Sequence, residues 1–105
     1  MEYKLIITQN FKDDLDSILE YISQQLFNSS AADRLMKKAE EKVRSIKENP
    51  FLYPIYHDEI LAGKGYRYTV VSNYILFYTV DQENKIVSVL RLIYGGQNIL
   101  NILNT

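Results

Sequence analysis

The sequence predicts an α+β domain of the order β-α-α-β-β-β, with a helical hairpin packed on one face of a small antiparallel sheet. Two observations lead to this fold class. Apolar residues recur at spacings of three and four over residues 11–26 and again over 32–46, which is typical of amphipathic helices. The last third of the chain reads instead as apolar strands separated by short polar turns.

Length and composition limit the function classes. The chain has 105 residues, 47% of them apolar, which predicts a single domain over residues 1–105 with one core. It contains no cysteine, which excludes disulfides, thiolate catalysis and Cys-ligated zinc. The formal net charge of −1 counts against a protein whose affinity comes mainly from phosphate contacts.

The sequence also indicates where in the cell the protein works. No apolar run approaches the length of a membrane span, and residues 1–11 lack the basic start and long apolar stretch of a signal peptide. We therefore expect a mature chain that begins here, works in the cytoplasm and has no membrane partner.

A short strand at residues 2–8 is followed by the first helix. Its apolar stripe comprises Phe11, Leu15, Ile18, Leu19, Ile22 and Leu26. Thr8 or Asn10 is expected to cap this helix. The acidic residues Asp13, Asp14 and Asp16 are expected in its first turns, where the helix dipole favours negative charge.

The second helix is predicted from about residue 31 to 48. Its buried stripe comprises Ala32, Leu35, Met36, Ala39, Val43 and Ile46. Asn49 and Pro50 stop it, because a residue before proline disfavours the helical conformation. The connection at residues 28–30 is short, so the two helices should form an antiparallel hairpin.

Residues 51–65 are predicted to be irregular, and three strands follow at 66–72, 74–80 and 85–94. Consecutive strands joined by short turns should form an antiparallel meander, with the N-terminal strand pairing at its edge or middle. The helices then cover one face, and the other face stays partly open for function. Residues 97–105 form a tail that is either flexible or packed on a partner, and 98–103 form either a short helix or a last strand.

Few residues offer chemistry. His57 is the only histidine and is more often structural than catalytic in such a loop, and its surroundings give no metal-ligand pattern. Arg67 and Arg91 lie inside predicted strands, where an unpaired cation is costly to bury. Arg91 either pairs with the acidic first helix or meets a ligand, and Arg67 is the better functional candidate. The nearby strand tyrosines make an interaction surface plausible.

The stretch GYRYTVVSNYILFYTVDQENKIVSVLRLIYGGQN, residues 65–98, resembles the RelE/ParE toxins of bacterial type II toxin–antitoxin systems. It has an Arg-bearing strand, a Tyr-x-Leu-x-Tyr strand, a polar turn and a strand ending in Leu-Arg-Leu-Ile-Tyr-Gly-Gly. One branch of this family, like RelE and YoeB, cuts messenger RNA on the ribosome without metal. The other branch, like ParE, poisons DNA gyrase and is not an enzyme.

The ending of the last strand places the chain closer to the ParE branch. Where the cutting branch has basic residues or histidine, this sequence has Thr69, Ile75 and Ile93. It also departs from the ParE pattern, with Tyr94 in place of His, Gln97 in place of Arg and Asn98 in place of Asp.

The resemblance implies a toxin of a plasmid-stabilisation module that inhibits growth by binding DNA gyrase. A cognate antitoxin would neutralise it, would alone contact operator DNA, and no cofactor or metal is implied. The implied target- or antitoxin-binding residues are Arg67, Tyr68, Arg91, Tyr94, Gln97 and Asn98. One alternative is a ribosome-dependent endoribonuclease with Arg67, Arg91 and Tyr94 as catalytic residues. The other is a weakened toxin that only binds its antitoxin.

Overall fold

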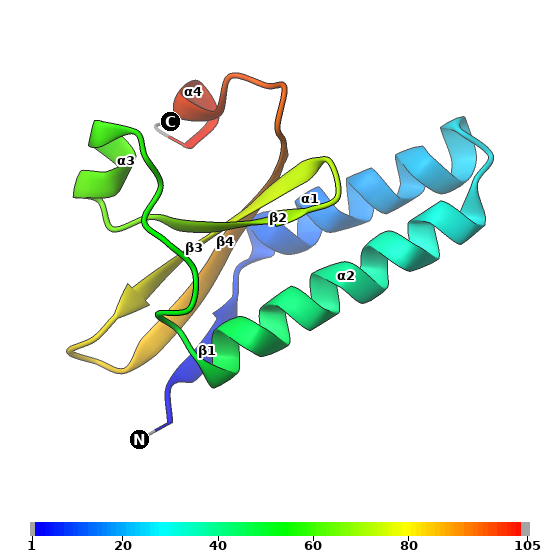
Figure 1. Ribbon diagram of the computed structural model, residues 1–105. Helices are drawn as coiled ribbons and strands as arrows, with labels where there is room; N and C mark the ends of the chain where they lie inside the picture. Colours follow the sequence, from blue (N-terminus) through cyan, green and yellow to red (C-terminus); the bar gives the residue numbers. More distant parts are fainter. Residues whose placement is uncertain (1, 104–105) are drawn as a thin grey trace.

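The computed structural model describes residues 2–103 and confirms the predicted α+β fold (Figure 1). Strand β1 (Lys4–Ile7) leads into helix α1 (Gln9–Glu20), a π-helical turn η1 (Tyr21–Gln25) and helix α2 (Ser29–Glu48). The short helix α3 (Glu59–Gly63) precedes the strands β2 (Arg67–Val71), β3 (Tyr74–Asp81) and β4 (Ile86–Tyr94), and helix α4 (Ile99–Leu103) follows them. Within the described chain, every helix is too short or too polar to span a bilayer.

The four strands form one sheet in the order β1-β4-β3-β2. β2, β3 and β4 make the predicted antiparallel meander. β1 pairs with β4 in parallel, from Lys4 opposite Ile86 to Ile7 opposite Val89, so the expectation of a wholly antiparallel sheet is wrong for this pair. The alternation of side chains reads the same in both directions of a strand, so the sequence pattern of β1 fixes its buried face but not its direction.

A β-bulge interrupts the pairing of β3 with β4. Phe77 lies opposite Arg91 and Tyr78 lies opposite Val89, which leaves Leu90 without a direct partner. The extra residue changes the alternation, so that Val89 and Leu92, three positions apart, both face the helices. Arg91 would share a face with Val87 and Val89 in a regular strand, and the bulge turns it away from the helical core.

The main core lies between the helical hairpin and the sheet. Its buried residues are Phe11, Leu35, Ala39, Ile46, Val71, Leu76, Tyr78, Val87, Val89 and Leu92. Most of both predicted stripes therefore face the sheet, and Thr8 caps α1 as expected, with its side chain accepting the Phe11 N–H. The expectation that Asp13, Asp14 and Asp16 lie in the first turns is wrong, because α1 begins at Gln9 and places them further along the helix.

The end of the first helix also differs from the prediction. The α-helix ends at Glu20, and η1 continues it with the wider spacing of a π-helix. This change of period rotates Leu26, the last residue of the predicted stripe, out of the core, and its side chain is 55% exposed. In Figure 1 the hairpin tip, where η1 meets the start of α2, projects beyond the sheet.

The second face of the sheet, which the sequence predicts to stay partly open, is covered at one end by two short helices. α3 and α4 close over a second cluster of buried residues that comprises Leu61, Phe77, Ile93, Ile99 and Leu103. α3 forms within the segment predicted to be irregular because the Asp58 side chain accepts the N–H groups of Ile60 and Leu61. α4 settles residues 99–103 as a helix, and positions 104 and 105 of the predicted tail lie outside the described residues.

Candidate functional site

Arg91 is held by an ion pair with α1. Its Nε atom donates to Asp14 Oδ2 at 2.7 Å, and its Nη2 atom donates to Asp14 Oδ1 at 3.0 Å. Hydrogen bonding to this carboxylate raises the pKa of Arg91, and burial opposes the shift. The interpretation of Arg91 as the partner of the acidic first helix is thus confirmed, and this bidentate geometry keeps the guanidinium paired although the side chain is 28% exposed.

The same carboxylate completes the edge of the sheet. β1 ends at Ile7, so the outer edge of β4 beyond Val89 has no strand beside it. Thr8 Oγ1 donates to the carbonyls of Val89 and Leu90, and Asp14 Oδ2 accepts the Leu92 N–H at 3.0 Å. Asp14 therefore satisfies a backbone donor and a cation together, which makes the pair a structural unit.

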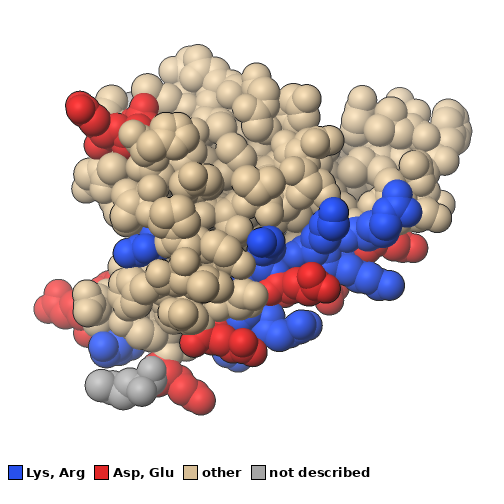
Figure 2. All heavy atoms as spheres, in the orientation of Figure 1, with Lys and Arg blue, Asp and Glu red and all other residues tan. Residues whose placement is uncertain are grey.

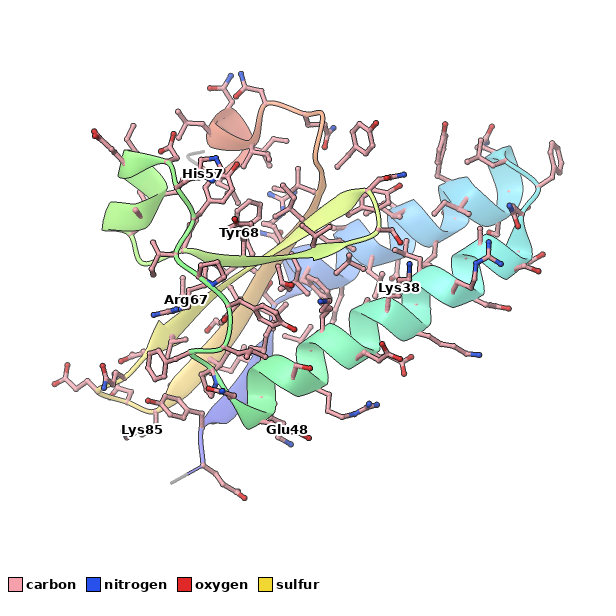
Figure 3. All side chains as sticks on the ribbon, in the orientation of Figure 1. Lys38, Glu48, His57, Arg67, Tyr68 and Lys85 are labelled. Carbon is pink, nitrogen blue, oxygen red and sulfur yellow. The ribbon has the colours of Figure 1, made fainter. Side chains whose placement is uncertain are left out.

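Arg67 is engaged at the opposite edge of the sheet. Its Nη1 atom donates to the Tyr53 carbonyl at 2.7 Å, and its guanidinium carbon lies 5.0 Å from the centre of the Phe51 ring. The neighbouring backbone groups are paired too, because the Tyr68 N–H donates to the Pro54 carbonyl at 3.1 Å. Figure 3 shows Arg67 at the start of β2 beside this segment. The cation–π contact and the hydrogen bond account for its position.

The two arginines do not form one site. Arg67 lies opposite Tyr78, which belongs to the core under the helices, whereas Arg91 lies opposite Phe77, which belongs to the cluster under α3 and α4. Directly opposed residues share a face of a sheet, so the two arginine side chains leave their strands on opposite faces, and their guanidinium groups bind at opposite edges. A single phosphate cannot be bound between them without rearrangement of the sheet.

Tyr68 belongs to an aromatic cluster on the second face. The centre of its ring is 5.1 Å from that of Tyr56 and 6.2 Å from that of His57, and the ring centres of Tyr56 and His57 are 4.4 Å apart. Figure 3 shows His57 and Tyr68 on the same side of the sheet. Burial, followed by the charges of Asp58 and Tyr68, raises the pKa of Tyr56. This phenol therefore stays protonated at neutral pH and is a poor candidate for a general base.

His57 and the predicted residues Gln97 and Asn98 line a cleft of about 550 Å³ between α3 and α4. Asp58 and Glu59 are the charged residues of its lining, so its field opposes a phosphate group. Asn98 has a structural role, because its Oδ1 atom accepts the Asn101 N–H at the start of α4. In the described residues there is no cluster of three metal-ligating side chains.

Tyr94 lies away from all of these groups, at the far end of β4. Its side chain is 50% exposed, and its ring packs edge-on against Tyr74 with centres 5.9 Å apart. The six predicted site residues are thus distributed over the two edges of the sheet, the α3–α4 cleft and the end of β4. They do not converge on one active site.

An apolar groove lies between α1 and α2, and its lining residues are not among the predicted site residues. The two helices diverge from the tip (Figure 1), and a groove of about 320 Å³ lies between them. Its lining is Ile7, Phe11, Leu15, Met36, Ala39 and Val43, with Glu40, Arg44 and Lys47 at the rim. The breadth of the apolar stripe on α2, which includes Met36 and Val43, was the available signal.

The comparisons with known proteins agree with this architecture. The β-α-α-β-β-β arrangement is that of toxins of bacterial type II toxin–antitoxin systems. The family model described as the ParE toxin of the type II toxin–antitoxin system parDE matches residues 5–99, and the chain belongs to this family. The resemblance inferred from residues 65–98 is thereby confirmed, on the ParE side. No curated protein is similar enough in sequence to count as a match.

Solved structures show the same fold at low sequence identity. A chain of the chromosomal ParDE system from P. aeruginosa superposes with a TM-score of 0.71 at 18% identity, covering 89% of this chain and 96% of that one. The YoeB/ParE toxin from Agrobacterium tumefaciens gives 0.60 at 19% identity, with 87% and 96% covered. A chain of the RelBE2 toxin–antitoxin complex from Mycobacterium tuberculosis gives 0.54 at 20% identity, with 90% and 99% covered.

Proposed function

We propose that this ParE-type toxin inhibits growth in the cytoplasm by binding DNA gyrase, and that it does not cleave RNA. The placement of Arg67 and Arg91 carries this proposal. They are engaged at opposite edges of the sheet by Tyr53 and Asp14, so the cationic pair that would stabilise a cleaving phosphate is not assembled. Phosphoryl chemistry depends on such preorganised positive charge.

The rest of the second face supports a binding role. The space above β3 and β4 is filled by Leu61, Phe77, Ile93, Ile99 and Leu103, all of them apolar. The adjoining cleft carries Asp58 and Glu59, and the chain as a whole is slightly acidic. A toxin that cleaves RNA on the ribosome must attract the RNA phosphates, whereas the carboxylates of this cleft would repel them.

We also propose that a cognate antitoxin neutralises the toxin by laying an amphipathic helix into the groove between α1 and α2. The groove offers an apolar floor with charged residues of both signs at its rim, which is the surface that such a helix recognises. Met36 is partly exposed there without a function in the core. Contacts with operator DNA would be made by the antitoxin, because the toxin has a formal net charge of −1.

Two parallel assays with purified protein test the target. The toxin should inhibit DNA supercoiling by gyrase and should leave messenger RNA intact on programmed ribosomes. Cut messenger RNA with unaffected gyrase would contradict the proposal, and loss of that cutting in Arg67→Ala would then establish the endoribonuclease alternative. If the protein affects neither gyrase nor messenger RNA but still binds the antitoxin, it is a weakened toxin that only binds its antitoxin.

A pair of variants tests the antitoxin groove. Met36→Glu places a carboxylate among the apolar groups of the groove and should weaken antitoxin binding by about tenfold or more. Lys37→Glu, on the exposed side of the same helix, changes charge more strongly and should have a smaller effect. Equal losses in both variants would show that general charge, and not the groove, controls the interaction.

A further inference from the structure

The hairpin tip exposes apolar side chains in a costly conformation. Phe27 is 90% exposed and has a φ angle of 51°, and Leu26 and Tyr21 are 55% and 53% exposed. A left-handed backbone disfavours a bulky residue, and glycine or asparagine is the usual choice. The tip follows directly on the π-helical turn η1, and such turns are rare and frequently lie at functional sites. Folding alone does not account for an exposed phenylalanine at this position.

A notch of about 280 Å³ separates the tip from the turn between β2 and β3. Ile22, Leu26, Leu35 and Tyr74 form its apolar part, and Arg34 and Lys38 are its charged residues. Figure 3 shows Lys38 on the side of α2 that faces this turn, where its Nζ atom reaches Ser72 Oγ at 3.4 Å. Among the described residues, neither Arg34 nor Lys38 forms an ion pair with a carboxylate. The notch therefore combines an apolar wall with two cations that have no anionic partner.

Aromatic residues extend this surface onto the end of the sheet. Tyr74 packs against Tyr94, and burial followed by the neighbouring Tyr21 and Tyr94 raises the pKa of Tyr74. Gly96 permits the position of the Tyr94 ring, because a Cβ atom there would lie 2.7 Å from its Cε2 atom. In Figure 2 the surface over the tip and the end of the sheet is formed by uncharged residues, with cations along α2 directly below.

We infer that Tyr21, Leu26, Phe27, Tyr74 and Tyr94, which we call the tip surface, dock the protein target of the toxin through a segment that carries an apolar side chain beside carboxylates. The apolar side chain would enter the notch, and Arg34 and Lys38 would meet the carboxylates. This inference rests on the proposed binding function. The tip surface and the groove assigned to the antitoxin have no lining residue in common. A tip that projects beyond the sheet suits insertion into a recess of a larger partner.

The variant Phe27→Asn separates docking from folding. The aromatic ring makes almost no intramolecular contact, and asparagine tolerates positive φ, so the melting temperature should stay unchanged or rise. The concentration needed for half-inhibition of purified gyrase should rise about tenfold or more. Antitoxin affinity should stay unchanged. Arg34→Glu should weaken gyrase inhibition in the same direction through charge reversal.

Leu52→Ser is the control, since Leu52 is an apolar residue, 51% exposed, on the loop before α3 and away from the tip. It should inhibit gyrase as the wild type does. Full inhibition by Phe27→Asn, with an active wild-type protein, overturns the inference and leaves the proposed function intact. Loss of antitoxin binding in Phe27→Asn, or a wild-type dimer that this variant dissociates, would assign the surface to another occupant and also overturn it.

Growth arrest on expression distinguishes failure of the proposed gyrase target from failure of the tip-surface inference. If the wild type arrests growth without affecting gyrase, the proposed target is wrong. The inference then stands only if Phe27→Asn relieves the arrest while it keeps antitoxin binding. If the variant arrests growth as the wild type does, the tip surface has no part in toxicity.

Discussion

The two ends of α1 differ in how their residues are satisfied. At its start, Thr8 and Asp14 complete the edge of β4 and neutralise Arg91, so polar groups that look functional in the sequence serve the fold. At its end, η1 turns apolar side chains outward and leaves Phe27 exposed. The charged residue Arg91 in a strand thus has a structural role, whereas the apolar residue Phe27 contributes little to packing.

The largest expected effect on stability is at Phe11, near the start of α1, and it contrasts with Phe27 at the exposed tip. Phe11→Ala removes a buried ring from the core and should lower the free energy of unfolding by about 3–5 kcal/mol. The same truncation at Phe27 removes a ring that packs on little and should change it by less than about 0.5 kcal/mol. Urea unfolding measures both values. Comparable losses would mean that the tip is part of the core.

A second substitution removes the polar link at the start of α1. Asp14→Ala leaves the partly buried Arg91 and the Leu92 N–H without their acceptor, and should destabilise the fold by about 2–3 kcal/mol. Asp13→Asn, which alters an exposed hydrogen bond with Gln9, is the control and should change little. A loss below about 0.5 kcal/mol for Asp14→Ala would show that solvent screens the pair.

The strands and helices followed from periodicity, and the Arg91 pairing followed from the cost of burying an unpaired cation. Three features did not follow. Nothing in the pattern of β1 fixes its direction, the bulge at Leu90 changes the face of Arg91, and the π-helical turn moves Leu26 out of its stripe. Each depends on a backbone hydrogen-bonding pattern, between strands for the first two and within the turn for the third, which the spacing of apolar residues does not determine. For the same reason the sequence grouped Arg67 with Arg91, which the sheet separates.

A third prediction concerns Tyr78, whose buried hydroxyl donates to the Pro50 carbonyl at 2.9 Å. Tyr78→Phe should cost about 1–2 kcal/mol by leaving that carbonyl unpaired. Burial raises the pKa of Tyr78 above its ordinary value of 10.0, so the folded state holds its proton more tightly than the unfolded state. Stability should therefore be intact below pH 10 and fall as the pH rises beyond it.

The alkaline loss of stability should be smaller in Tyr78→Phe, because the variant lacks the phenol that ionises more readily on unfolding. Denaturation at a series of pH values, followed by circular dichroism, measures this difference. An unchanged alkaline profile in the variant would assign the effect to other tyrosines, of which Tyr74 and Tyr56 also have raised pKa values.

The central claim is that the toxin acts by binding and not by catalysis, and induced expression without antitoxin tests it most directly. We predict growth arrest with double-strand DNA breaks, an SOS response and intact messenger RNA. Truncated messenger RNA with intact DNA would contradict the account, and would show that Arg67, Arg91 and Tyr94 come together on the ribosome in a way that the free protein does not display.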